Sequence, residues 1–117
     1  MLQGLSRWQA VTALILCAGT GLPAHAQDEY AARMLAKQNN CFRCHAIDRE
    51  KNAPAWSAIA VKYRSKPDAE EKLLKHLTSA PKVKLLEDGI EEEHKIAKYS
   101  DRAELVNMVR WVLSLQR

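Results

Sequence analysis

Two cysteines and a histidine fall within one short stretch of the chain, Cys41-Phe42-Arg43-Cys44-His45. This C-x-x-C-H spacing is typical of covalent haem attachment. Two thiols three residues apart, on a turn that enters a helix, can add to the two vinyl groups of one haem, while the next imidazole is carried directly under the iron. We therefore predict one covalent haem c, bound through Cys41 and Cys44 and ligated at its iron by His45.

Two other uses of a cysteine pair fit the sequence less well. A thioredoxin-like redox pair belongs on a β-α-β unit, but no Val/Ile-rich strand pattern surrounds these cysteines, and a redox pair does not need the adjacent histidine. A zinc site requires a second pair of ligands. The only other cysteine is Cys17, and His76 and His94 are 18 residues apart, outside the usual close spacing. The sequence therefore favours haem.

The first 26 residues differ in composition from the rest of the chain. Arg7 is their only charged residue, and most of the residues after it are apolar or small. The apolar stretch is short for a membrane span, and Ala24-His25-Ala26 has the small-x-small pattern of a cleavage site, so we predict a secretory signal peptide over residues 1–26 and a mature domain over 27–117. An uncleaved N-terminal anchor is the alternative. Export to the periplasm agrees with covalent haem, which is attached on the outer side of the bacterial membrane.

Composition and periodicity predict a single helical domain. The 117 residues are 47% hydrophobic and 27% charged, only 4 are glycine and 4 proline, and residues of high helix propensity dominate. A capping box, Asp101-x-x-Glu104, is expected to begin the last helix. Apolar spacing and capping residues predict the three earlier helices over residues 28–38, 56–63 and 68–78. The stretches 46–55 and 82–99 are predicted loops, the second a candidate ligand loop.

Three further stretches carry a resemblance to a known family. Residues 44–48 read Cys-His-Ala-Ile-Asp, residues 53–56 read Ala-Pro-Ala-Trp, and residues 111–114 read Trp-Val-Leu-Ser. They resemble the haem-binding segment, the Gly-Pro loop and the C-terminal helix of the small mono-haem class I cytochromes c of bacterial periplasms. The resemblance runs over residues 27–117. It implies an all-α class I cytochrome c fold, with the four predicted helices wrapped around one covalent haem.

The resemblance also implies roles for residues outside the cysteine motif. By this resemblance, the carbonyl of Pro54 accepts a hydrogen bond from the ring nitrogen of His45 that is distal to the iron, which fixes the tautomer. Trp56 is expected near a haem propionate. The first and last helices are expected to cross, with Ala32 or Ala36 allowing their close approach.

The sequence departs from the family at the second axial ligand. The family's methionine lies in a Met-Pro-Pro loop, which is missing here, and it typically precedes the Ser-Asp of the last helix by six residues. His94 precedes Ser100 by six residues. We therefore expect the iron to be ligated by His45 and His94. The alternatives for the sixth position are an open site or one of four other side chains: His76, Lys95, Met108 and Met34.

Bis-histidine ligation sets the expected function. Nitrogen-only ligation lowers the potential of a haem relative to Met/His ligation, and an iron with both axial positions filled leaves no place for a substrate. We therefore expect a one-electron carrier that cycles its haem between Fe(III) and Fe(II) and is not an enzyme. One alternative is a haem subunit fixed in a periplasmic oxidoreductase. Another, if the sixth site is open, is a ligand-binding sensor or enzyme.

The charge pattern predicts protein partners. Residues 62–84 carry seven basic and three acidic residues, whereas residues 87–93 carry five acidic residues and no basic one. Such opposite patches can orient a redox donor and acceptor. Without Arg7 the net charge falls from +4 to +3, and no basic motif is interleaved with aromatic residues, so nucleic-acid binding is not expected. No small-molecule substrate is expected, and contact with a membrane is expected only transiently, through partners.

Overall fold

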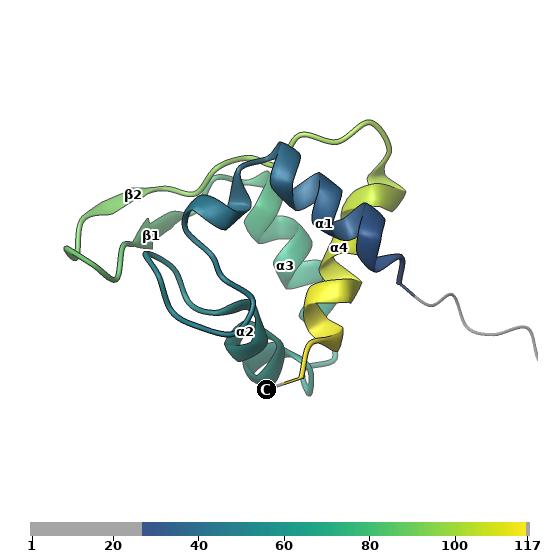
Figure 1. The fold of residues 1–117 in the computed structure, drawn as a ribbon, viewed down its shortest axis with the longest axis horizontal. Helices are drawn as coiled ribbons and strands as arrows, with labels where there is room; N and C mark the ends of the chain where they lie inside the picture. Colours follow the sequence, from purple (N-terminus) through teal and green to yellow (C-terminus); the bar gives the residue numbers. More distant parts are fainter. Residues whose placement is uncertain (1–26, 117) are drawn as a thin grey trace, which may run out of the picture.

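Four α-helices and a short β-hairpin make up residues 27–116, the part of the chain that the computed structural model describes (Figure 1). In chain order, the elements are α1 (Glu29–Gln38), the 3-10 turn η1 (Cys41–Arg43), α2 (Trp56–Tyr63), α3 (Ala69–Thr78), β1 (Lys82–Lys84), β2 (Glu91–Glu93) and α4 (Arg102–Ser114). The predicted signal peptide, residues 1–26, lies outside the described residues. Within residues 27–116, no helix has the length and apolar character needed to cross a membrane.

Local sequence signals account for the starts of α1 and α4. The side chains of Asp28 and Asp101 each accept a hydrogen bond from an amide in the first turn, at 3.0 and 2.9 Å, so each is an N-cap. Glu104 forms a modified version of the predicted capping box, because its carboxylate accepts from the Ser100 amide, at 3.1 Å, one residue before the cap. The predicted helix boundaries agree with the observed ones to within one residue.

The core lies where α1 crosses α4, and these two helices make the most extensive contact of any pair in the described structure. Ala32 and Ala36 are fully buried on α1 and allow the two backbones to approach, while Leu105 is fully buried on α4. Trp111 of α4 packs edge-on against Trp56 of α2, with ring centroids 5.5 Å apart. The expected crossing of the first and last helices is confirmed.

The structure differs from the sequence prediction over residues 82–99, where a loop was expected throughout. The strands β1 and β2 pair antiparallel, and each lysine of β1 lies opposite a glutamate of β2. Opposite charges across a strand pair stabilise it. Gly89 in the connecting turn has φ +73°, a conformation that other residues rarely adopt. Three-residue strands are too short to produce a readable alternation, which is why the pattern did not reveal them.

The hairpin projects from the helices on the side away from the start of α1 (Figure 1). It is joined to the loop after the cysteine motif, because the amide of Leu86 donates to the carbonyl of Asn52 at 3.0 Å. The fold is otherwise helical, so the expected fold class is confirmed.

Candidate haem site

The cysteine motif forms a tight turn directly after α1. Asn40 has a left-handed backbone conformation, φ 56°, which takes the chain out of α1 and into η1. The amides of Cys44 and His45 both donate to the carbonyl of Cys41, at 3.2 and 2.9 Å. Both thiols are free and half-buried. Burial raises the pKa of the Cys41 thiol, and the nearby charge of Lys95 offsets this only in part. One short segment therefore presents two thiols and an imidazole.

A backbone carbonyl orients the His45 ring. The Nδ1 atom of His45 lies 2.9 Å from the carbonyl oxygen of Pro54. When Nδ1 donates its hydrogen to that oxygen, Nε2 carries the free lone pair and is available to a metal ion. Burial lowers the pKa of His45, and the hydrogen bond to Pro54 opposes this only in part. Burial therefore favours the neutral ring, which is the form that binds a metal ion.

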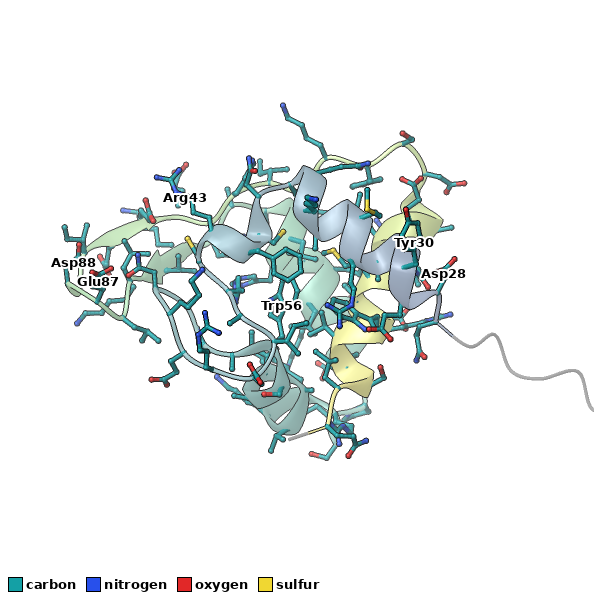
Figure 2. The ribbon with its side chains drawn as sticks, in the orientation of Figure 1. Asp28, Tyr30, Arg43, Trp56, Glu87 and Asp88 are labelled. Carbon is teal, nitrogen blue, oxygen red and sulfur yellow. The ribbon has the colours of Figure 1, made fainter. Side chains whose placement is uncertain are left out.

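Hydrogen bonds within the loop hold Pro54 in place. The amides of residues 53, 56 and 57 donate to the carbonyls of residues 44, 46 and 47 at 2.8–3.0 Å. Trp56, which begins α2, stacks on the His45 ring with centroids 5.5 Å apart and planes at 28°. Figure 2 shows Trp56 near the centre of the view. Trp56 is expected near a haem propionate, and its ring lies beside that of His45.

The β-hairpin determines which way His94 points. The His94 amide donates to the carbonyl of Pro81 at 2.8 Å, so the strand pairing continues one residue beyond β2. Side chains alternate between the two faces of a strand pair. His94 therefore lies on the same face of the hairpin as the half-buried Val83 of β1 and on the opposite face from Glu93.

The rings of His94 and His45 face one another across the site. Their centroids are 6.3 Å apart and their planes meet at 54°. The Nδ1 atom of His94 lies 2.9 Å from the carbonyl oxygen of Lys95, which leaves Nε2 free, as in His45. The two imidazoles thus share one arrangement, with a backbone carbonyl at Nδ1 and a lone pair at Nε2.

The other candidates for the sixth ligand have different surroundings. His76 on α3 lies beside His94, with ring centroids 4.3 Å apart. Burial lowers the pKa of His76, and the neighbouring histidines lower it further. Met108 is buried in the helical core, Met34 is partly exposed on α1, and Lys95 is exposed. The structure therefore brings three histidines together.

The elements around the site also carry apolar side chains that suit a haem. These side chains are half-buried, pack against the helical core and come from the cysteine turn and its loop, from α2 and from α3: Phe42, Ile47, Ile59, Leu73 and Leu77. Phe42 packs against Trp56 with ring centroids 5.1 Å apart. A flat and largely apolar cofactor can cover side chains of this kind. The thiols, the oriented imidazole and these apolar side chains together match the chemistry of a covalently bound haem.

A covalent-attachment motif and an imidazole oriented by a backbone carbonyl, on a framework in which the first and last helices cross, define a c-type cytochrome. A family model for cytochrome c matches residues 31–116, and the chain belongs to that family. It is a small mono-haem class I cytochrome c that binds one covalent haem c. It is an electron carrier and not an enzyme.

Similar proteins span most of the chain. Cytochrome c-552 of Hydrogenobacter thermophilus is 30% identical over 88 residues, which are 74% of this chain and 84% of that one. The crystal structure of class 1 cytochrome MtoD from Sideroxydans lithotrophicus ES-1 is 48% identical, has a TM-score of 0.74 and matches 79% of this chain and 100% of its own. Cytochrome c552 of Nitrosomonas europaea is 30% identical, with a TM-score of 0.56 over 72% of this chain and 99% of its own.

Two features near the site escaped sequence analysis. The carbonyl of Lys95, which orients His94, is a backbone atom and has no sequence signal of its own. The side chain of Asn39 hydrogen-bonds to the segment that follows His94. An asparagine near the end of a helix is an ordinary C-terminal residue, so its type did not predict this long-range contact.

Proposed function

We propose that the protein is a periplasmic one-electron carrier whose haem iron is ligated by His45 and His94. The observation that carries this proposal is the pair of facing imidazoles, whose ring centres are 6.3 Å apart. Two imidazoles that bind one metal ion from opposite sides, with nitrogen–metal distances of about 2.0–2.1 Å, place their ring centres about 6 Å apart. The observed spacing therefore supports a single iron between the two rings.

The chain's own residues account for the rest of the proposed mechanism. When bound, the haem supplies one-electron chemistry at its iron. Cys41 and Cys44 would hold it covalently, and His45 and His94 would each supply a nitrogen ligand to its iron, which would leave no position for a substrate. The carbonyls of Pro54 and Lys95 keep each ring in one tautomer and orientation, so the ligands need little rearrangement when the charge on the iron changes.

The predicted signal peptide and the charge pattern support the proposed location and partners. Residues 1–26 have the composition of a secretory leader, which favours the periplasm. Five acidic residues lie in the hairpin segment 87–93, which we call the acidic hairpin, and Figure 2 shows Glu87 and Asp88 at its tip. The basic residues of 62–84 come largely from α2, α3 and the turn between them. We propose that these two charged regions orient a redox donor and a redox acceptor.

The optical spectrum of the oxidised, haem-loaded mature protein tests the ligation. We expect a low-spin spectrum without the weak charge-transfer band at the red end that a sulfur–iron bond produces. The variant His94→Ala is expected to become high-spin, because it loses one axial nitrogen. His76→Ala is the matched control, since its ring contacts that of His94 and is not proposed to bind the iron. It is expected to stay low-spin.

Three results would contradict this assignment. A sulfur–iron band in the unaltered protein would point to Met108 or Met34. A high-spin spectrum that binds carbon monoxide readily would indicate an open site and hence sensing or catalysis. Loss of the low-spin spectrum in His76→Ala but not in His94→Ala would make His76 the ligand.

Cell fractionation tests the location. After expression of the full chain in a bacterium that matures c-type haem, we expect the protein in the periplasmic fraction, with an intact mass that begins at Gln27 and includes one haem. A membrane-bound protein that retains residues 1–26 would instead support the uncleaved anchor.

A further inference from the structure

A buried asparagine side chain connects the end of α1 to the segment that carries His94. Asn39 is 4% exposed, and its amide group forms a two-way pair with the backbone of Lys98, which is 59 positions away. Nδ2 donates to the Lys98 carbonyl at 2.9 Å, and Oδ1 accepts from the Lys98 amide at 2.7 Å. Nδ2 also donates to the carbonyl of Leu35, at 3.0 Å. The buried amide therefore has partners for both its oxygen and its nitrogen.

The segment at the other end of this pair has no helix or strand of its own. Residues 94–99 run without regular structure between β2 and α4. The backbone joins them to the rest of the protein at two points, His94 to Pro81 and Ala97 to Leu77, each at 2.8 Å. The third connection is the pair with Asn39. Because a side chain makes it, a substitution can remove it without altering residues 94–99 themselves.

The hydrogen-bonded pair of Asn39 and Lys98 lies close in sequence to the residues expected to bind the haem. Asn39 precedes Cys41 by two residues, and Lys98 follows His94 by four. One side chain thus links the chain just before the covalent attachment to the chain just after the proposed sixth ligand. Any outward movement of His94 together with its segment would break both hydrogen bonds to Lys98 and leave the Asn39 oxygen without its partner, which is costly, although Nδ2 would keep its bond to Leu35.

We propose that Asn39 is a positioning residue that keeps the His94 segment closed over the iron. Asn39 does not touch the reacting atoms; it acts through Lys98 and the backbone between Lys98 and His94. The inference rests on the proposed function, because it assumes that His94 is the sixth ligand. Its consequence is measurable without a redox partner, since an external ligand can bind the iron only while His94 is displaced.

The rate of cyanide binding to the oxidised, haem-loaded protein tests the inference. In Asn39→Ala, the low-spin spectrum without cyanide is expected to persist. Cyanide binding is expected to become faster by about tenfold or more, because displacement of residues 94–99 no longer breaks hydrogen bonds to residue 39. A denaturant titration of each variant records the accompanying loss of overall stability.

Asn107→Ala is a matched control. Asn107 on α4 forms the same kind of two-way pair with the backbone of Asp28, at 2.8 Å in both directions, at the start of α1. It has no contact of this kind with residues 94–99. We expect Asn107→Ala to lose stability and to bind cyanide at nearly the rate of the unaltered protein. Equal acceleration in both variants, or acceleration in neither, would overturn the positioning role.

Two further variants separate the possible failures. If Asn39→Ala does not fold, Asn39→Asp keeps an acceptor for the Lys98 amide and loses the donated bonds. Because its second oxygen would face the carbonyls of Lys98 and Leu35, it should also accelerate cyanide binding, and an unchanged rate would refute the inference. If His94→Ala has the spectrum and cyanide rate of the unaltered protein, then His94 is not the ligand and the proposed function itself fails. If His94→Ala alters the spectrum and the cyanide-binding rate but Asn39→Ala leaves that rate unchanged, only the role of Asn39 is refuted.

Discussion

At the scale of single residues, the site depends on the direction in which two ring nitrogens point. His45 and His94 each have Nδ1 at 2.9 Å from a backbone carbonyl, so in both rings the free lone pair is on Nε2. Carbonyls belong to the backbone and survive any side-chain substitution at Pro54 or Lys95. The course of the backbone at Pro54 and Lys95 therefore determines the tautomer of both rings.

Replacing the proposed sixth ligand tests this scale. We expect His94→Met to introduce the sulfur–iron charge-transfer band and to raise the reduction potential on the order of 100 mV, within the roughly 0.8 V that axial ligands span. The thioether stabilises reduced iron relative to an imidazole nitrogen. A potentiometric titration with optical detection measures the shift. Met substitution at His76 is the control, and a potential that rises there but not at position 94 would exchange the roles of the two histidines.

At the scale of elements, the crossing of α1 and α4 supports the cysteine turn, whereas the hairpin orients His94. The crossing brings the two ends of the described chain together through small buried side chains, Ala32 and Ala36, so it supports the cysteine turn that follows α1. The hairpin sets the alternation that places His94 on the face of Val83. A shift of its register by one residue would turn His94 to the face of Glu93.

Enlarging a buried alanine tests the crossing. Ala36→Leu is expected to lower the free energy of unfolding by about 1–3 kcal/mol, because the added atoms have no space between the helices. Ala31→Leu is the matched control on an exposed position of the same helix, where the change is expected to stay within about 0.5 kcal/mol. Urea denaturation of the haem-loaded variants measures both values. Equal losses at the two positions would argue against a tight contact at Ala36.

At the scale of the whole molecule, charge is distributed unevenly while the net charge is small. The acidic hairpin lies away from the start of α1, and the basic residues of 62–84 lie largely on α2, α3 and the turn between them (Figure 1). Lys82 and Lys84 lie on β1 opposite glutamates of β2, so the hairpin carries both signs, and its excess of negative charge includes Glu87 and Asp88 at the tip. Regions of opposite sign give the molecule an electric dipole, even at a net charge of only +4 for the full chain. Partners of opposite sign are therefore expected to approach different faces.

Small charged oxidants test the hairpin's part in this pattern. Replacing Glu87 and Asp88 by glutamine and asparagine is expected to speed oxidation of the reduced protein by the anion ferricyanide about twofold to fivefold at low salt, and to slow oxidation by a cationic cobalt complex. Both effects should vanish at high ionic strength. The control replaces Glu29 and Glu71, on α1 and α3, by glutamine. Equal effects in the two double variants would show that net charge alone matters.

The sequence by itself determined the features that depend on residues close together in the chain, namely the helix positions and the cysteine motif. Helix positions followed from capping residues and from apolar spacing, and the cysteine motif was recognisable because both thiols and the imidazole lie within one turn of chain. The family followed from such local segments. The prediction of His94 as a ligand also rests on a local feature, its distance of six residues from Ser100, and it remains a prediction.

Only the tertiary structure decided which distant groups meet. The approach of His94 to His45, the contact of His76 with His94 and the pairing of Asn39 with Lys98 all join residues far apart in the chain. The hairpin that directs His94 has strands too short to leave a periodic pattern. Such contacts depend on how whole elements pack, and packing is a property of the assembled core that no stretch of neighbouring residues encodes alone.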